Sequence, residues 1–282
     1  MRLATIRLEG STAAARVENG LYYVLPYSDV RSVLESSGDW RKTAETDIGL
    51  VLDEHQVDLA PVVPNPEKII CVGLNYQDHA AETGQMIPEF PTLFAKYSRS
   101  LIGAFDELVL PDASDAVDWE IELGIVVGRQ VRSAPPEKSW DAIAGYTVVN
   151  DVSMRDWQVR TSQYLQGKTF ESSTPIGPHL VSPDEIDHAR DLEVRCDVDG
   201  DVVQKSSTSK LIFNPAEIVS YISQFITLVP GDVIATGTPG GIGAARNPAR
   251  FLEAGQRLTS TIDGIGSLSN PCTRNIGQNR KV

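Results

Sequence analysis

The chain has 282 residues, of which 41% are hydrophobic and 22% charged, a composition that excludes disordered, collagen-like and coiled-coil proteins. Its 25 basic and 38 acidic side chains give a formal net charge of −13, so we expect no nucleic-acid partner. Because there is neither a long apolar run nor a secretion signal, we expect no membrane partner. Three widely spaced cysteines, Cys71, Cys196 and Cys272, favour a cytoplasmic protein without disulfides.

The first 60 or so residues predict a small β-rich unit. Polar and apolar residues alternate at the start, and residues 21–25 form a second predicted strand. A short helix follows, with Ser28 as its expected N-cap. Three prolines within 60–66 disfavour both helix and central strand, which is typical of a linker. We therefore predict two domains, 1–66 and 67–282.

Short strands dominate the second domain. They are expected at 69–73, 119–127, 145–149, 192–198, 231–235 and 257–262. One longer helix is clearly indicated, because Asn214 and Glu217 form a capping box around Pro215. Its expected apolar stripe consists of Ile218, Tyr221, Ile222, Phe225 and Ile226. Strands outnumber helices without strict alternation, which argues against a Rossmann sheet and for an α+β or mostly β core.

Two glutamates on one strand are the first candidate site. A strand's period of two places Glu120 and Glu122 on the same face, about 7 Å apart along the chain. A solvated strand face would explain them, but the continuation 123–127 is apolar on both faces and indicates burial. Asp151 ends another apolar strand, as a metal ligand or as an ordinary turn residue. Three carboxylates would favour Mg²⁺ or Mn²⁺, with Ca²⁺ as a further option, over zinc.

His79 and Glu82 are the second candidate, because an i, i+3 spacing on a helical turn brings their side chains together. A carboxylate beside an imidazole prepares the ring to accept a proton, although an incidental surface pair has the same spacing. Lys168, next to a glycine, is either a cation for a developing negative charge or a surface lysine. The glycine-rich loop 235–243 offers backbone N–H groups to an anion but is no Walker A loop.

The order of these segments resembles the fumarylacetoacetate hydrolase family. The segments are GLNYQDHAAE, WEIELGIVVG, GYTVVNDVSMRDWQ, GKTF, GDVIATGTPGGIG and IDGIGSLSNP, and the resemblance spans about residues 67–272. It implies an α+β fold built as a mixed β-sandwich roll, a divalent cation, a 2-oxo or β-diketo acid as substrate, and a homodimer.

The resemblance also implies roles for single residues. Glu120, Glu122 and Asp151 would be the metal ligands. The catalytic groups would be His79, Glu82, Lys168 and Gln158, and the substrate contacts would be Arg155 and Thr238. Gln158 would donate to an oxyanion. Asn75 stands where the founding enzymes supply a further metal aspartate, so the site resembles the acylpyruvase and oxaloacetate decarboxylase branch.

Four activities are compatible with these residues. We expect hydrolysis of a C–C bond in an acylpyruvate or fumarylpyruvate, compounds typical of aromatic catabolism, with release of pyruvate and a carboxylic acid. In that reaction His79 would deprotonate the attacking water. Oxaloacetate decarboxylation and isomerisation or hydration of a 2-oxo-dienoate are the enzymatic alternatives. A metal- or oxo-acid-binding module without catalysis is the fourth.

Overall fold

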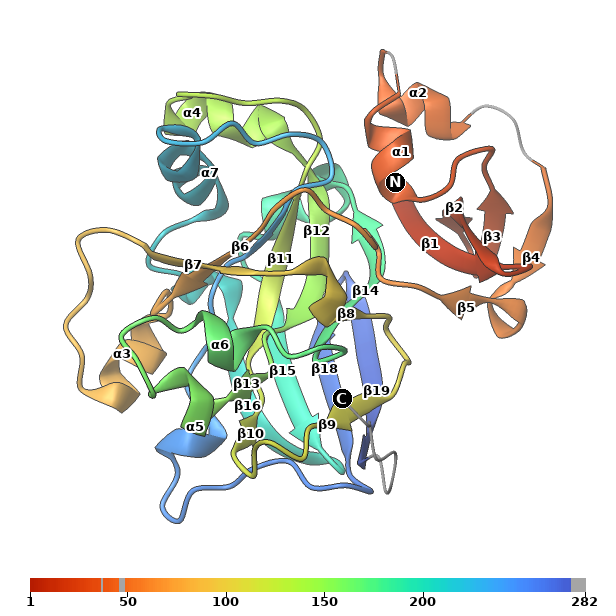
Figure 1. The fold of residues 1–282 in the computed structure, drawn as a ribbon. Coiled ribbons are helices and arrows are strands. Elements are labelled where there is room, and N and C mark those ends of the chain that lie inside the picture. The colour runs from red at the N-terminus through yellow and green to blue at the C-terminus, as the bar shows by residue number, and fades with distance from the viewer. Residues whose placement is uncertain (37, 46–48, 275–282) are drawn as a thin grey trace.

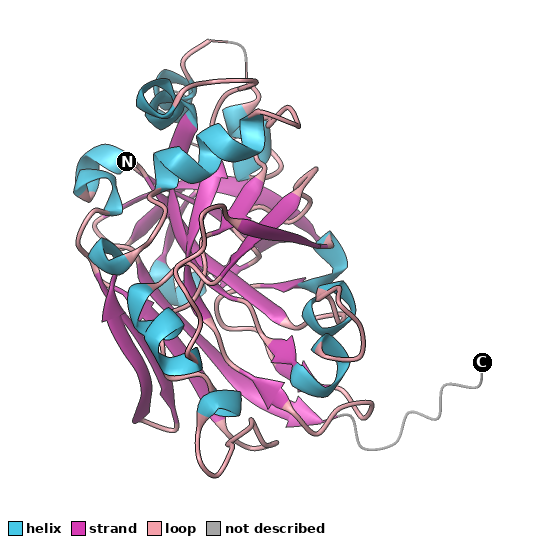
Figure 2. Ribbon diagram, turned by 90° about the vertical axis from the view of Figure 1, so that its left-hand side faces the viewer, coloured by secondary structure: helices cyan, strands magenta, loops and turns pink. Residues whose placement is uncertain are grey.

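Two packed β-sheets form the body of the protein, and short helices cover their outside (Figure 1 and Figure 2). The computed structural model describes residues 1–36, 38–45 and 49–274. Strands predominate over helices in this part of the chain, which confirms the predicted α+β fold. None of the described helices is long and apolar enough to cross a membrane.

The larger sheet is mixed. Within the described residues it has twelve strands, ten of them in the order β4-β3-β2-β1-β14-β12-β11-β17-β6-β7, with β5 on β1 and β8 on β14. These strands are β1 (Arg2–Leu8), β2 (Ser11–Glu18), β3 (Leu21–Val24), β4 (Val51–Asp53), β5 (Asp58–Leu59), β6 (Ile69–Gly73), β7 (Thr92–Lys96), β8 (Leu101–Ile102), β11 (Ile121–Val127), β12 (Ile143–Asn150), β14 (Thr174–Val181) and β17 (Val233–Ala235).

The smaller sheet has the order β16-β15-β18-β19-β9, and a two-stranded ribbon joins β10 to β13. These strands are β9 (Leu108–Leu110), β10 (Val117–Asp118), β13 (Ser153–Met154), β15 (Glu193–Val198), β16 (Asp201–Ser207), β18 (Arg257–Ile262) and β19 (Gly266–Arg274). The α-helices are α1 (Val30–Leu34), α2 (Trp40–Glu45), α3 (Gln77–Thr83), α4 (Pro136–Ser139), α5 (Arg155–Gln158), α6 (Leu165–Lys168) and α7 (Pro215–Ser223). Single 3-10 turns lie at Glu54–Gln56, Ser98–Ser100, Trp140–Ala142, Pro183–Glu185, Asp187–Ala189, Thr208–Lys210 and Gly243–Ala245.

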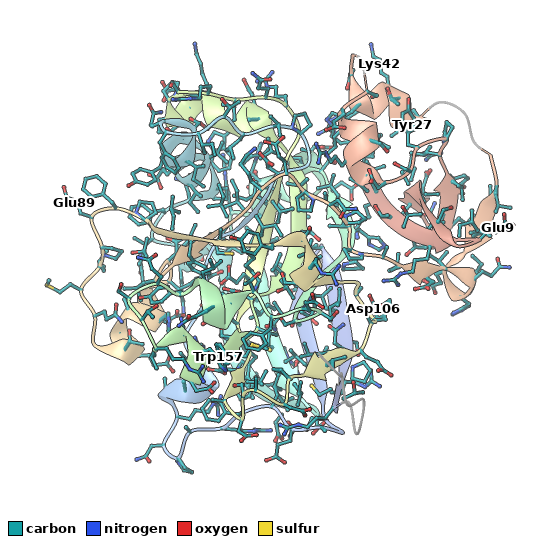
Figure 3. The ribbon with its side chains drawn as sticks, in the orientation of Figure 1. Glu9, Tyr27, Lys42, Glu89, Asp106 and Trp157 are labelled. Carbon is teal, nitrogen blue, oxygen red and sulfur yellow. The ribbon has the colours of Figure 1, made fainter. Side chains whose placement is uncertain are left out.

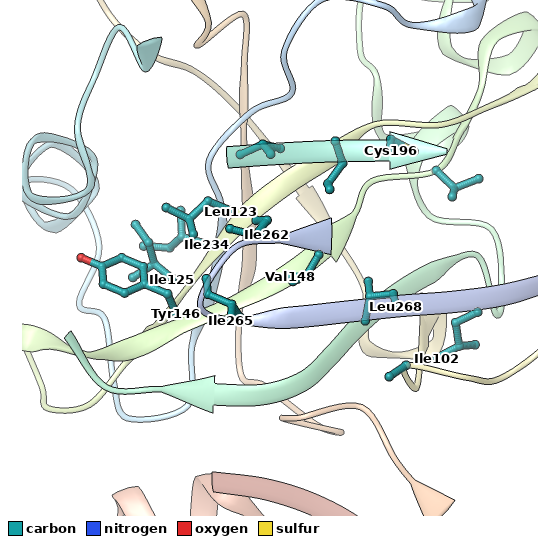
Figure 4. Close-up of a cluster of buried hydrophobic side chains, with 14 of the residues drawn as sticks. Ile102, Leu123, Ile125, Tyr146, Val148, Cys196, Ile234, Ile262, Ile265 and Leu268 are labelled. Carbon is teal, nitrogen blue, oxygen red and sulfur yellow. The ribbon is translucent and has the colours of Figure 1, made fainter. Parts of the chain in front are cut away.

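The main core lies between the two sheets. Leu123 of β11 and Val148 of β12 pack in one cluster with Ile262 of β18 and Leu268 of β19 (Figure 4). All residues of β11 and β12 are buried. Because both faces of these strands are covered, they are the most constrained part of the sheet and a rigid base for a site at their ends.

The N-terminal β-rich unit continues the large sheet, since β1 pairs antiparallel with β14. The segment 60–66 has no helix or strand, as the prolines predict, but Val62 and Val63 are fully buried in it. The boundary at residue 66 therefore stays a prediction. Ser28 is not the N-cap of α1: Asp29 caps it by accepting from the Ser32 N–H at 2.7 Å.

Helix α7 begins as predicted and ends earlier. The Asn214 side chain accepts from the backbone of the first turn, and Glu217 accepts from the Asn214 N–H at 2.8 Å. Since the helix ends at Ser223, the expected apolar stripe does not continue beyond it. Phe225 is 58% exposed and Ile226 37% exposed, so these two positions of the stripe were wrong.

Candidate active site

The predicted carboxylates lie where β11 begins and β12 ends. Because the two strands are antiparallel, with Ile121 opposite Asn150, the residues flanking this pair meet at one end of the sheet. The Asp151 N–H donates to the Glu120 carbonyl at 2.8 Å, and the Asn150 side chain accepts from the Glu120 N–H at 2.9 Å. These two hydrogen bonds hold the backbones of Glu120 and Asp151 beside each other.

Glu120, Glu122 and Asp151 each offer a carboxylate oxygen within 4.8 Å of the others. All three side chains are buried, with residue exposures of 6%, 1% and 0%. A solvated strand face is therefore excluded for the two glutamates. Buried carboxylates this close repel one another unless cations lie between or beside them.

Three cationic side chains contact this carboxylate triad. Lys168 Nζ bridges Glu120 Oε2 and Asp151 Oδ2, the latter at 2.8 Å. Lys96 Nζ holds the other oxygen of Asp151 at 2.6 Å, and Arg155 Nη1 lies 2.7 Å from Glu120 Oε1. Lys168 reaches the triad from α6, where Gly167 lets the helix approach α5: a Cβ at Gly167 would lie 2.5 Å from the Gln158 backbone nitrogen.

Arg155 is itself held by Asp118, a buried carboxylate 2.8 Å from its Nε. Asp118 also accepts from the N–H groups of Gly243 and Ala244, at 2.7 and 3.0 Å. One carboxylate thus joins Arg155 to the end of the glycine-rich loop. The Arg155 Nη2 atom is buried and has no partner within the described residues, so a donor remains available at the site.

The two glutamates have opposite electrostatics. Burial would raise the pKa of Glu120, but Lys168 and Arg155 lower it to about 2. Burial, reinforced by Asp151 and Glu120, raises the pKa of Glu122 well above its usual value. Among the described residues no cationic side chain contacts Glu122, and the Gly237 N–H donates to it at 2.7 Å.

This imbalance fits a divalent cation at the triad. Asp118 and the triad together are four buried carboxyl groups, and among the described residues three cationic side chains pair with them: Lys96, Lys168 and Arg155. With all four ionised, one negative charge would have no partner, which is why the pKa of Glu122 is raised. A divalent cation would supply the partner that Glu122 lacks and turn the net charge of the cluster positive. The all-oxygen donor set suits Mg²⁺, Mn²⁺ or Ca²⁺.

The predicted pair on α3 is formed. His79 Nδ1 lies 3.2 Å from Glu82 Oε2, and the second oxygen of Glu82 accepts from the Gly241 N–H at 2.9 Å. Asp78 makes a parallel contact, since it accepts from the Gly240 N–H at 3.3 Å. Helix α3 is therefore docked on the glycine-rich loop, and Glu82 orients the imidazole from that side.

One cavity of about 310 Å³ joins these groups. Its polar walls include His79, Glu120, Glu122, Arg155, Gln158, Lys168 and Thr238. Asp151 and Glu82 contact these residues from behind. In Figure 3, Trp157 marks α5 beside the cavity, and Glu89 marks the outer end of the segment that follows α3. From that segment, Met86 and Pro88 also line the cavity.

The remaining predicted contacts lie in the same cavity. Gln158 Oε1 accepts from Arg155 Nη1 at 2.9 Å, so the amide is oriented with its nitrogen available as a donor. Thr238 Oγ1 accepts from Gln204 Nε2 at 2.8 Å and keeps its own hydrogen for another partner. The structure thus brings all predicted site residues together; their roles stay predictions.

Asn75 has a structural position instead of a ligand position. Its Nδ2 donates to the carbonyls of Phe213 and Thr236, at 3.1 and 2.7 Å, and its Oδ1 accepts from the Phe213 N–H at 2.8 Å. These bonds saturate the amide. Close packing of the glycine-rich loop explains the buried amide, because a Cβ at Gly237 would lie 2.8 Å from the Asn75 Cβ.

Sequence reasoning missed Lys96 and Asp118. Both are buried, and both bind predicted site residues. Asp118 immediately precedes the two-glutamate strand, so its position was a usable signal. Lys96 ends the strand β7, and only the tertiary pairing of β7 with β6 brings it near Asp151.

Comparison with known proteins shows the family and agrees with the fold. The fumarylacetoacetate hydrolase C-terminal family matches residues 68–273, and the chain therefore belongs to the fumarylacetoacetate hydrolase family. A mitochondrial oxaloacetate tautomerase of Xenopus laevis is 43% identical over 223 residues, which are 78% of this chain and 70% of that protein. The human mitochondrial oxaloacetate tautomerase FAHD2A is 40% identical over 222 residues, 78% of this chain and 71% of the other.

Solved structures show the same architecture. A fumarylacetoacetate hydrolase from Exiguobacterium antarcticum has a TM-score of 0.87 and 30% identity, with 98% of this chain and 100% of the other covered. Fumarylpyruvate hydrolase from Pseudomonas aeruginosa, solved with Mn²⁺ and pyruvate, has a TM-score of 0.69 and 34% identity, with 74% and 91% covered. The family thus includes proteins named as tautomerases and as hydrolases.

Proposed function

We propose that this protein is a divalent-metal-dependent enzyme that interconverts the enol and keto forms of a 2-oxo acid, with oxaloacetate as its substrate. The observation that carries the proposal is the three-carboxylate cluster, buried and within 4.8 Å, beside a cavity that His79 also lines. The oxaloacetate tautomerases among the relatives support this choice of substrate.

The carboxylates Glu120, Glu122 and Asp151 would hold the cation, Mg²⁺ or Mn²⁺ by the chemistry of the donor set, with Ca²⁺ as a further option. The cation supplies Lewis-acid stabilisation of negative charge on the substrate's 2-oxo oxygen. Lys168 and Arg155 add positive charge to the cavity wall and attract the carboxylates of the substrate. Gln158 offers an amide donor to the same oxygen.

His79 is the proton carrier in this proposal. A Glu82 carboxylate that accepts from Nδ1–H leaves Nε2 with a lone pair. During ketonisation the C2 hydroxyl loses its proton and C3 gains one, so the reaction needs no co-reactant. Proton transfer by a positioned imidazole contributes about 10² to 10⁴ in rate.

Hydrolysis of an acylpyruvate or fumarylpyruvate is the second candidate, favoured because His79, paired with Glu82, lines the same cavity as Glu120 and Glu122. His79 would deprotonate a water, whose oxygen bonds to the distal carbonyl carbon. The C–C bond then breaks, and the pyruvate enolate leaves and gains a proton while Gln158 and Lys168 stabilise negative charge. The Mn²⁺–pyruvate complex of fumarylpyruvate hydrolase supports this alternative.

A side-by-side assay of the metal-loaded protein tests the proposal. Oxaloacetate enol, fumarylpyruvate and a simple acylpyruvate are offered with Mg²⁺ or Mn²⁺, and enol absorbance and pyruvate release are followed separately. Enol loss without pyruvate release, abolished by a chelator, is the expected result. Pyruvate from oxaloacetate instead indicates decarboxylation, and pyruvate from the acylpyruvates indicates hydrolysis. Metal binding without turnover on any of them supports a binding module.

A homodimer and a cytoplasmic location are also proposals. The dimer is implied by the family resemblance, and sedimentation of the purified protein tests it. The location is inferred from the unpaired, buried cysteines, whereas the relatives named above are mitochondrial. Fluorescent tagging of the native chain in its own cells tests the location.

A further inference from the structure

A second concave surface lies beside the segment 246–253, whose Leu252 N–H donates to the Val117 carbonyl of β10 at 2.8 Å. It encloses about 790 Å³, more than twice the 310 Å³ of the active-site cavity. Its wall is formed by the segment 246–253, Asp115 and the last residue of β19, Arg274. No residue with a proposed catalytic or metal-binding role lines it.

Three arginines meet in this cavity, although the whole chain is strongly acidic at −13. They are Arg246, Arg250 and Arg274. Two carboxylates share the wall: Asp115, whose side chain is 93% exposed, and Glu253. Guanidinium groups therefore outnumber carboxylates in the cavity, in contrast to the protein surface as a whole.

Much of the hydrogen-bonding capacity of Arg250 and Arg274 is unused, whereas Arg246 Nη2 donates to the carbonyls of Val203 and Gly241, at 2.7 and 3.4 Å. Among the described residues no acceptor receives a hydrogen bond from the Arg250 side chain, whose nearest carboxylate oxygen, on Asp201, is 3.6 Å away. Both terminal nitrogens of Arg274 share one oxygen of Asp115 at 3.4 Å. The Arg246 Nε is buried without a partner in the described part of the chain.

Two of these guanidinium groups lie beside the ring of the same buried tryptophan, Trp119. The Cζ atoms of Arg246 and Arg250 lie 5.7 and 5.9 Å from the centre of the Trp119 ring. Both distances are within the range of cation–π attraction. An anion in the cavity that contacts both arginines would be attracted by both positive charges.

We propose that this cavity binds a small anionic metabolite with at least two oxyanion charges, as in a phosphate monoester or a di- or tricarboxylate. Guanidinium groups recognise both kinds of anion through paired, charge-assisted hydrogen bonds. Three guanidinium groups around one cavity match a ligand with several negative charges better than they match a ligand with a single carboxylate. This site is separate from the one that holds the 2-oxo acid.

Trp119 provides a direct readout of occupancy. Titration of the metal-free protein with inorganic phosphate and, separately, with citrate is followed by tryptophan fluorescence and by calorimetry, with chloride at equal ionic strength as the blank. We expect saturable binding of at least one of the two anions, one per chain. Phosphate alone indicates a phosphate ester as the natural ligand, and citrate alone a polycarboxylate.

Variants locate the site. Arg250→Gln combined with Arg274→Gln should weaken binding at least about tenfold, because two charge-assisted contacts are lost. Arg129→Gln removes the same charge from an exposed ion pair outside the cavity and should leave binding unchanged. If the double variant does not fold, the single change Arg274→Gln, at a half-exposed side chain, takes its place. Absence of saturable binding, or equal affinity in wild type and variant, would overturn the proposal.

Discussion

The carboxylate cluster and the helix above it differ in how the fold holds them. The cluster lies at the ends of two fully buried strands, and each acidic side chain is fixed by backbone or cationic partners. Helix α3 has seven residues, and the segment behind it exposes Met86 by 90% and Phe90 by 59%. Two hydrogen bonds join the helix to the glycine-rich loop, and Asp78 also accepts from the Ser206 hydroxyl at 2.5 Å. Ala80 is the one residue of α3 that is buried.

This difference matches the chemistry assigned to each part. A cation requires ligands at fixed distances, so its site belongs on the rigid end of a sheet. A proton carrier must meet a substrate that enters and leaves, so a lightly held helix is suited to it. Changes in the cluster should therefore affect stability and metal affinity, whereas changes on α3 should affect rate alone.

The largest effect is expected from Asp151→Asn. Loss of this charge leaves Lys96 and Lys168 buried without a shared anionic partner, so the metal-free protein should lose about 3–5 kcal/mol of unfolding free energy. Urea denaturation measures the loss. Asp141→Asn, in the exposed pair with Arg129, is the control and should cost less than about 1 kcal/mol. Equal costs in the two variants would contradict a charge-dependent cluster.

His79→Ala tests the helix. We expect the rate on the best 2-oxo acid to fall by about 10² to 10⁴, because the proton carrier is gone. Mn²⁺ affinity and urea stability should stay at wild-type values. The control is His55→Ala, since the His55 side chain is 86% exposed and distant from the site. A variant that loses metal and activity together would show that α3 and the cluster are not separable.

Lys96→Met should disturb the carboxylate cluster less than Asp151→Asn does, because Asp151 keeps its contact with Lys168. The metal-free variant should lose about 1–3 kcal/mol of unfolding free energy, the cost of a buried polar group that loses a partner. Saturating Mn²⁺ should stabilise this variant more than the wild type, because the cation replaces the missing positive charge. Thermal melts with and without metal measure both effects. Lys205→Met, in an exposed pair with Glu193, is the matched control and should change neither.

The smallest effect is expected from Glu82→Gln. The amide oxygen can still accept from the Gly241 N–H, so α3 stays docked while the negative charge beside His79 is lost. We expect about a tenfold fall in rate, the scale of one charge-assisted hydrogen bond, with metal affinity unchanged. Glu89→Gln, on the exposed segment after α3, should leave the rate unaltered. A fall in rate as large as that of His79→Ala would assign Glu82 a proton-carrying role of its own.

Local patterns in the sequence predicted the two neighbouring glutamates and one of the two helix caps. The strand predicted over 119–127 placed Glu120 beside Glu122, although β11 itself begins at Ile121. The capping box located the start of α7. Both signals depend on neighbours in the chain. Ser28 was the wrong cap by one position, since Ser and Asp are both good N-caps and only the backbone dihedral of Asp29 decides between them.

Tertiary partners could not be predicted in the same way. Lys96 and Asp151 are 55 residues apart, and their contact depends on how β7 and β12 are placed in the sheet. Phe225 continued the apolar period of α7, but the helix ends first and leaves the ring outside the core. The sequence therefore predicts which residues can bind or react, and the fold decides which of them are paired.

The most direct test of the account is the position of the cation itself. Crystals grown with Mn²⁺ and measured near the manganese absorption edge would locate the ion by its anomalous signal. We expect one strong anomalous peak between Glu120, Glu122 and Asp151, with Lys168 Nζ displaced from at least one of its two carboxylates. Manganese bound elsewhere, with the three carboxylates still paired only to lysine and arginine, would contradict it.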